Sequence, residues 1–269
     1  MQRHRLLLVL LAATALTPAA AHADPVPTSA FAPIAGSGGC IVAGLVATPV
    51  CEHAESSSTQ TRVLQLSPDQ RQLLLVTGGT EINGGEEGTN AIVAYDRDAA
   101  TGALTLASCV SNDGGDDRLG SDGACADGDG LSGVNAIAMT ADGKALFATA
   151  GGSSSLVWFD RDPATGKLTQ AGCLKNFAWP GERCRTAAML GGASGGAVNG
   201  DGTLVFVTAA RTGSVTTFRR DPATNTLERV SCVSDNGSDG LCTDGTGLRG
   251  AGAVTTSADG SSVIVLGIR

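Results

Sequence analysis

Short apolar segments recur along the chain, separated by turns rich in glycine and aspartate. The clearest set comprises SGGAVN (194–199), LVFVTA (204–209), VTTF (215–218) and LERVSC (227–232). The nearly continuous apolar run at 204–209 is typical of a strand buried on both faces, whereas LERVSC alternates apolar and polar positions like a half-exposed outer strand. This pattern predicts four short antiparallel strands joined by tight turns.

The four-strand unit occurs at least three times, and each copy carries its own pair of cysteines. An aspartate ends the third strand of each copy, at Asp98, Asp162 and Asp221. A cysteine follows eleven residues later and a second one closes the unit, giving Cys109 and Cys125, Cys173 and Cys184, and Cys232 and Cys242. The units cover approximately 61–125, 135–184 and 194–242, and a partial unit combines 252–269 with 31–51.

Four-stranded units repeated every 40 to 60 residues are typical of a β-propeller, whose blades bury their faces against one another. We therefore predict an all-β protein with about four blades or an incomplete ring, in one domain (24–269). An insertion near Thr80–Asn90 lengthens the first unit between its second and third strands. A β-solenoid and glycine-rich disorder are the alternatives. A truncated gene product or a half-propeller that dimerises also fits the partial unit.

The first 23 residues have the pattern of a secretory signal peptide. Two arginines precede an apolar run (6–16), and Ala-His-Ala (21–23) forms a cleavage site. The apolar run is too short for a transmembrane helix, so we expect no membrane insertion. The sequence predicts cleavage near Ala23 and a secreted chain, either extracellular or periplasmic.

The charge balance narrows the choice of partners. The formal net charge of −8 becomes −10 once the two arginines of the predicted signal peptide are removed. An acidic surface repels phosphate backbones, so nucleic acid is not an expected partner. The partner that we expect is therefore a protein or a carbohydrate ligand. If the ring is incomplete, we also expect a homo-oligomer.

Eight cysteines follow the predicted cleavage site, and the repeat pairs them locally. Cys40 and Cys51 occupy the same place in the partial unit as the three pairs named above. We predict four disulfides, each worth about 3 kcal/mol in the chain-entropy description. Separations of 10 to 16 residues fit a zinc site poorly, and His53 is the single histidine after the cleavage site. No metal or cofactor is predicted.

A serine-hydrolase pattern, G-x-S-x-G, occurs around Ser194. The repeat aligns Ser194 with Asn135 and Gly252 in the first strand of a unit. The pattern requires a strand–turn–helix elbow, which is not predicted here. We therefore assign no catalytic role to Ser194.

Acidic residues cluster in two of the predicted disulfide loops. Asp235, Asp239 and Asp244 are weak candidates for calcium ligands, because clustered carboxylates and glycine turns suit that ion. The spacing breaks the EF-hand pattern and lacks the final glutamate. The alternative, that aspartate and glycine simply form turns, is favoured.

One disulfide loop departs from the other copies. Residues 175–182 (KNFAWPGE) place Phe177 and Trp179 where the other units carry aspartate and glycine. Aromatic side chains on a loop are suited to contact a sugar ring or a protein partner. The alternative is that Trp179 packs over its own disulfide.

The motifs of this chain resemble those of a known family. Ser67-Pro68-Asp69, FDRDPATG (159–166) and FRRDPAT (218–224) are similar to motifs of the seven-bladed lactonase-type propellers, including bacterial relatives of 6-phosphogluconolactonase, and of the YncE-like secreted propellers. The resemblance covers nearly the whole mature chain and implies a propeller. These motifs are turn and strand signatures, so they transfer no catalytic residue to this chain.

Three functional hypotheses follow. The first is a secreted, disulfide-stabilised propeller that acts as a binding or scaffold module, with no catalytic residue assigned. The second, implied by the resemblance, is a lactone hydrolase. The third is an inactive fragment of a longer propeller.

Overall fold

The computed structural model of the protein describes residues 61–77, 90–112, 125–257 and 261–267 in full, and gives strands alone at 41–42, 52–53, 80–82 and 85–87. The chain divides into two compact units, residues 1–33 and 34–269, and all described residues belong to the second. The predicted signal peptide, Cys40 and Cys51 lie outside the described residues.

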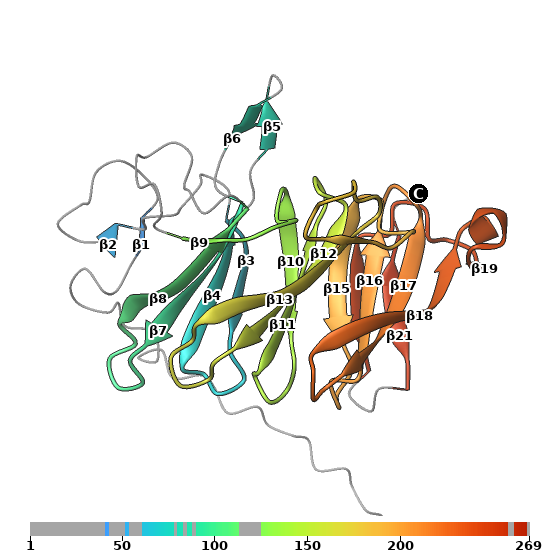
Figure 1. Ribbon diagram of the computed structural model, residues 1–269. Helices are drawn as coiled ribbons and strands as arrows, with labels where there is room; N and C mark the ends of the chain where they lie inside the picture. Colours follow the sequence, from blue (N-terminus) through green and yellow to red (C-terminus); the bar gives the residue numbers. More distant parts are fainter. Residues whose placement is uncertain are drawn as a thin grey trace, which may run out of the picture. The chain divides into compact units, whose positions relative to one another are not determined.

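The described residues form three five-stranded sheets with one shared topology (Figure 1). Sheet 1 contains β3 (Thr61–Leu66), β4 (Gln72–Thr77), β7 (Ala91–Arg97), β8 (Leu104–Ser111) and β9 (Ala126–Asp127). Sheet 2 contains β10 (Val134–Met139), β11 (Ala145–Ala150), β12 (Ser155–Arg161), β13 (Leu168–Lys175) and β14 (Arg185–Thr186). Sheet 3 contains β15 (Ala193–Val198), β16 (Leu204–Ala209), β17 (Ser214–Asp221), β18 (Thr226–Ser234) and β19 (Thr243–Asp244).

Smaller elements accompany the three sheets. Sheet 4 is an antiparallel pair, β20 (Ala253–Thr256) and β21 (Val263–Leu266). The predicted insertion forms an antiparallel pair between β4 and β7, made of β5 (Thr80–Ile82) and β6 (Gly85–Glu87). The remaining elements are the parallel pair β1 (Ile41–Val42) and β2 (Glu52–His53), and the short 3-10 turn η2 (Gly237–Gly240).

The all-β prediction is confirmed, and one detail of it is corrected. Each complete sheet has a fifth strand of two residues, which runs parallel to the fourth. This strand begins directly after the second cysteine of its unit, and the disulfide holds that cysteine close to the fourth strand. The Cα atoms of Cys173 and Cys184, for example, are 4.7 Å apart. Two residues are too few to show a periodicity in the sequence.

Successive sheets pack face to face, which is the arrangement of blades in a β-propeller. Sheet 2 shows why its second strand is apolar at nearly every position. Leu146 and Ala148 of β11 pack into the core shared with sheet 1, whereas Ala145 and Phe147 pack into the core shared with sheet 3. Because side chains alternate between the two faces of a strand, both sets must be apolar. Burying one phenylalanine contributes about 2 to 3 kcal/mol.

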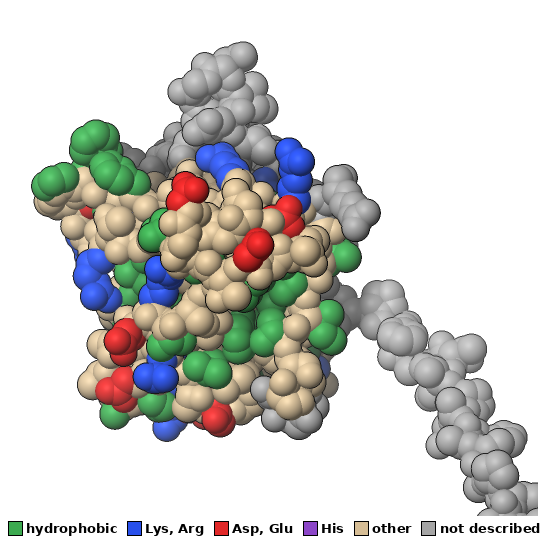
Figure 2. All heavy atoms as spheres, turned by 90° about the vertical axis from the view of Figure 1, so that its right-hand side faces the viewer, with side chains coloured by type: hydrophobic (Ala, Val, Ile, Leu, Met, Phe, Trp, Pro, Cys, Tyr) green, Lys and Arg blue, Asp and Glu red, His purple; other side chains and the backbone are tan. Residues whose placement is uncertain are grey.

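Sheet 4 presents a different surface. Val263, Ile264 and Leu266 of β21 are exposed to solvent. Figure 2 shows hydrophobic side chains across the middle of the side of the molecule on which β18 and β21 lie.

A buried arginine connects sheet 2 to sheet 1. Arg161 of β12 donates from Nε to Oε1 of Gln72 at 2.8 Å and from Nη1 to the Gly143 carbonyl at 2.9 Å. Gln72, in turn, donates from Nε2 to Oδ1 of Asp96 at 2.8 Å. Asp69 lies 3.5 Å from Nη2 of Arg161. The amide group thus relays hydrogen bonds between a buried guanidinium and a carboxylate.

The interface between sheets 2 and 3 contains the same relay with a different amide. Arg220 of β17 donates to Oδ1 of Asn225 at 2.7 Å, and Asn225 donates from Nδ2 to Oδ1 of Asp160 at 2.8 Å. Here the amide comes from the later sheet, whereas Gln72 comes from the earlier one.

The two interfaces are complementary in side-chain size. The repeat aligns Gln72 with Ala145 and Gly166 with Asn225, so a large amide always meets a small residue. Gly166 and Asn225 share a positive φ, of 68° and 51°. A Cβ atom at residue 166 would overlap the Gln72 amide. A side chain at residue 166 would therefore displace the Gln72 amide from its present position.

Exchanging these residues should reveal their coupling. We expect Gln72→Ala and Gly166→Asn each to lower the free energy of unfolding by about 1 to 3 kcal/mol. The first variant leaves Arg161 without its amide hydrogen-bond acceptor, and the second overlaps with the Gln72 amide. The double variant recreates the Ala145 and Asn225 pairing, so its loss should be smaller than the sum by about 1 kcal/mol or more. Urea denaturation with disulfides intact measures this.

Gly102→Asn is the matched control, because Gly102 occupies the same turn of sheet 1 at φ 75°. It reports the cost of asparagine at positive φ alone. If the loss of unfolding free energy in the double variant equals the sum of the losses in the two single variants, the proposed coupling through the relay is contradicted.

Candidate functional site

Three of the four predicted disulfides lie in the described residues and are present. They join Cys109 to Cys125, Cys173 to Cys184 and Cys232 to Cys242. Each closes a loop between the fourth and fifth strands of its sheet. The fourth pair, Cys40 and Cys51, falls outside the described residues and stays a prediction.

The loop of sheet 2 projects two aromatic side chains into solvent. Phe177 is 60% exposed and Trp179 is 69% exposed. Their ring centroids are 5.0 Å apart and their planes meet at 89°, which is an edge-to-face pair. Trp179 is therefore not covered by packing over its own disulfide, the alternative raised by the sequence.

Several contacts hold this aromatic loop, defined as residues 176–183. Lys175 and Glu182 form an ion pair of 3.0 Å across its base. The Ala178 N–H donates to Oγ1 of Thr186 at 3.1 Å. Arg183 pairs with Asp127 of sheet 1 at 3.6 Å. The loop is thus fixed by a disulfide and polar contacts while its rings remain uncovered.

The start of each loop is anchored in the same way. Asn112, Asn176 and Asp235 align in the repeat, and each accepts a hydrogen bond through Oδ1 from a leucine N–H, at 2.8, 3.1 and 2.9 Å. The donors are Leu131, Leu190 and Leu248. The residue after each anchor differs between the three copies, and in sheet 2 it is Phe177.

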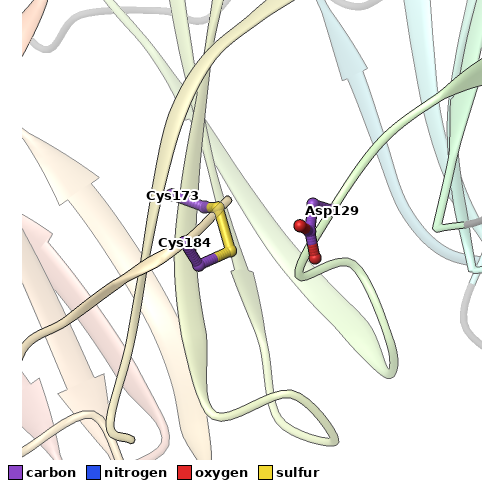
Figure 3. A group of neighbouring side chains, drawn as sticks. All are labelled: Asp129, Cys173 and Cys184. Atoms are coloured by element: carbon purple, nitrogen blue, oxygen red, sulfur yellow. A yellow bond between two sulfur atoms is a disulfide. The ribbon is translucent and has the colours of Figure 1, made fainter. Parts of the chain in front are cut away.

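One group of side chains has the composition of a metal site. Figure 3 shows Asp129 beside Cys173 and Cys184, with their ligand atoms within 4.8 Å of one another. Both sulfur atoms are joined in a disulfide, so neither is a thiolate that could bind a metal ion. Asp129 instead lies 3.7 Å from Nζ of Lys175. The group is structural.

The calcium candidates of the sequence do not converge. Within the described ranges, Asp235, Asp239 and Asp244 do not form a group of neighbouring ligand atoms. Asp235 accepts the Leu248 N–H, as described above, and Asp239 lies in the exposed turn η2. Their geometry fits turns and anchors.

Ser194 lies in strand β15, as the repeat predicts. Its hydroxyl donates to the Ala251 carbonyl at 2.5 Å and approaches the Thr208 carbonyl at 3.2 Å. The hydroxyl links sheet 3 to the segment ahead of sheet 4. This contact gives Ser194 a structural role.

A hollow of about 360 Å³ lies beside the loop of sheet 3 and escaped the sequence analysis. Arg211, Arg249, Asp235 and Asn236 line it, together with the turn at 210–213. Its residues come from 210–213, from Asp235 and Asn236, and from Arg249, and no single sequence pattern joins them. Only the alignment of the units could have shown that both arginines depart from the repeat.

Comparison with known proteins identifies the family. The profile described as "Lactonase, 7-bladed beta-propeller" matches residues 86–240, which is more than half of the chain. The chain belongs to this lactonase family. The match includes the turn sequences at 159–166 and 218–224 and the whole aromatic loop, and it confirms the resemblance drawn from the motifs.

Solved structures provide further comparisons. The periplasmic gluconolactonase PpgL of Pseudomonas aeruginosa is 17% identical, with a TM-score of 0.48, and the match covers 76% of this chain and 49% of that one. A functionally unknown protein from Desulfotomaculum acetoxidans is 14% identical, with a TM-score of 0.49 and coverages of 78% and 50%. The chain thus spans half or less of the length of these structures. None of the curated proteins matches it.

Among the residues described, no helix has the length and apolar character needed to cross a bilayer.

The aspartates that end the third strands stabilise tight turns. Asp162 accepts the Ala164 N–H at 2.8 Å and the Thr165 hydroxyl at 2.9 Å. Asp98 accepts hydrogen bonds from the Thr101 N–H, which has the largest effect, and from the Thr101 hydroxyl. Asp221 accepts hydrogen bonds from the Ala223 N–H and the Thr224 hydroxyl. These hydrogen bonds hold the pKa of all three carboxyls below the ordinary value of 3.8.

These turns predict a loss of stability in acid. A folded-state pKa below 3.8 means that the stabilisation is complete above pH 3.8 and disappears as the pH falls through the lower folded-state pKa values. The triple variant Asp98→Asn, Asp162→Asn, Asp221→Asn should therefore show a flatter fall in the free energy of unfolding below about pH 4. Urea unfolding over a pH series measures the slope.

Asp239→Asn serves as the control, since it neutralises an exposed aspartate outside these turns. A triple variant with the wild-type slope would show that the turns do not titrate as described.

Proposed function

We propose that this lactonase-family chain is a glycan-binding module whose contact surface is the aromatic loop. The observation that carries the proposal is the exposed edge-to-face pair of Phe177 and Trp179 on a loop held by a disulfide. Leaving two aromatic rings in water forgoes burial worth about 2 kcal/mol or more for each. A bound ligand would recover that free energy.

The geometry favours a sugar over a protein partner. A stable protein interface buries roughly 800 Å² on each side, far more than two side chains of a short loop provide. One or two sugar rings, by contrast, match the area of an aromatic pair, whose faces stack on the apolar face of a pyranose. Glu182 and Arg183 belong to the same loop and offer polar groups for sugar hydroxyls.

Loop rigidity supports the same reading. The Cys173–Cys184 disulfide and the Lys175–Glu182 pair restrict the loop before any ligand arrives. Binding then costs less conformational entropy, because the rings are already positioned.

The covalent framework supports a location outside the cytoplasm. Disulfides persist in oxidising environments, and the predicted signal peptide at residues 1–23 agrees with export. We propose that the module acts outside the cytoplasm, where it meets extracellular or envelope glycans and not nucleic acid.

Removal of the aromatic pair tests the proposal. Phe177→Ala with Trp179→Ala should weaken binding to glycans recovered on a glycan array by about tenfold or more, since both stacking contacts disappear. In the wild type, ligand should also change the fluorescence of Trp179, because this ring is exposed whereas Trp158 is buried.

Leu241→Ala is the matched control, because Leu241 is an exposed apolar residue on the equivalent loop of sheet 3. Unchanged glycan binding by the double variant would remove the aromatic loop as the site.

Lactone hydrolysis is the second candidate, and membership of the lactonase family favours it. Incubating the purified mature chain with a panel of sugar and acyl lactones, with and without divalent cations, tests it. If the chain is a binding module alone, hydrolysis should not exceed the spontaneous rate. Hydrolysis above that rate would make the chain an enzyme and overturn the exclusive binding role.

A further inference from the structure

The disulfide of sheet 3 differs from the other two described disulfides in what lies beside its sulfur atoms. Nη2 of Arg229 donates to Sγ of Cys232 at 2.6 Å and lies 3.7 Å from Sγ of Cys242. The same nitrogen donates to the Leu241 carbonyl at 3.1 Å, which holds the guanidinium against the disulfide. A permanent positive charge therefore contacts the sulfur atoms.

The repeat does not require an arginine at this place. Three residues before the first cysteine, the other two units carry Leu106 and Gln170. Gln170 exchanges hydrogen bonds with the backbone of Asp129, at 2.8 and 3.0 Å. Arg229 is thus a local feature of sheet 3, and the three disulfides form an internal comparison within one chain.

The guanidinium of Arg229 is incompletely satisfied. Among the described residues it has no carboxylate partner, whereas Arg161 and Arg183 each have one. Its Nε is buried and lacks a hydrogen-bond partner there. A disulfide sulfur is a weak hydrogen-bond acceptor, but a thiolate next to an arginine is strongly stabilised. Arg229 therefore favours the state in which Cys232 carries a negative charge.

The two cysteines of this bridge are unequally covered. Cys232 is buried, whereas Cys242 is half-buried beside the exposed Leu241. The cysteines of the other two described bridges are all buried. A reagent from solvent therefore reaches the sulfur of Cys242 first, and the sulfur that must then leave is the one that Arg229 contacts.

We propose that the Cys232–Cys242 disulfide is a thiol-exchange site that an uncharged dithiol modifies selectively. One thiolate of the dithiol attacks Sγ of Cys242 and forms a mixed disulfide. The Cys232–Cys242 bond breaks, and its electron pair leaves with Cys232 as a thiolate beside Arg229. The second thiolate of the reagent then attacks the reagent's own sulfur in the mixed disulfide. Cys242 leaves as a thiolate, and the dithiol is oxidised to a cyclic disulfide by two electrons.

Opening this bridge releases a loop that contributes little to the core. Between residues 235 and 241, only Gly237 is buried. Asp235 and Asp239 lie in this loop, so an anionic thiol is disfavoured relative to an uncharged one. Oδ1 of Asp235 also accepts the Leu248 N–H, so modification loosens the path from sheet 3 to sheet 4. The aromatic loop keeps its own disulfide.

Limited reduction of the full mature chain with dithiothreitol tests the site. Native protein is treated at neutral pH for increasing times, free thiols are trapped with N-ethylmaleimide, and peptide mass spectrometry quantifies each cysteine. Cys232 and Cys242 should be labelled about tenfold faster than the other two described pairs, because their leaving thiolate is stabilised and their bridge is accessible.

Variants at Arg229 separate the effect of its charge from the exposure of Cys242. Arg229→Gln places there the residue type that sheet 2 carries at the aligned position, and it should slow labelling of this pair about fivefold or more. Arg229→Lys keeps the charge and should slow it less. Arg219→Gln is the matched control, since it removes an exposed arginine from the same sheet, and it should keep the wild-type rate.

Unfolding midpoints establish that the variants fold. Equal labelling of the three pairs in the wild type would overturn the proposal, and so would a wild-type rate in Arg229→Gln. The measurement needs no ligand, so its outcome is independent of glycan binding by the aromatic loop.

Discussion

The structure depends on burying both faces of each sheet against its neighbours. A single four-stranded sheet whose second strand is apolar at nearly every position would leave one apolar face in water. In sheet 2, the alternation of Leu146 and Phe147 sends one side chain into each of two cores. The loops that carry the candidate sites are therefore attached to a frame fixed by packing, and their own sequences are free to change.

Two buried arginines enter this apolar frame, and hydrogen bonds satisfy both guanidinium groups. Arg161 and Arg220 are buried, and the removal of two charges from water is costly unless their donors are used. An amide supplies an acceptor for each guanidinium and passes a donor to an aspartate of the preceding sheet. These relays fix how one sheet is seated on the next, a task for which apolar contacts are less directional.

The sequence predicted the features that repeat and missed those that arise from one contact in space. Strand period, turn residues and the spacing of cysteines recur in every unit, so each copy reinforced the interpretation of the others. The two-residue fifth strands left no periodic signal. The hydrogen bond between Arg161 and Gln72 joins residues 89 positions apart in the chain, and no local sequence pattern predicts it. The aromatic loop was singled out because it broke the repeat, although the exposure of Trp179 was left open. Arg211 and Arg249 depart from the repeat at single positions and were not noticed.

The same two aligned positions hold Gln72 and Gly166 at the first interface and Ala145 and Asn225 at the second. Each interface therefore has its own combination of large and small residues. A sheet whose turn carries Asn225 fits the neighbour with Ala145 and collides with the neighbour that carries Gln72. The contact residues, as well as the connectivity of the chain, therefore determine the order in which the sheets pack. A folding intermediate in which sheet 3 packs on sheet 1, with sheet 2 left out, would bury an amide group that lacks its hydrogen-bond partner. In a protein built from units that share one topology, such mismatches discourage misassembly between repeats.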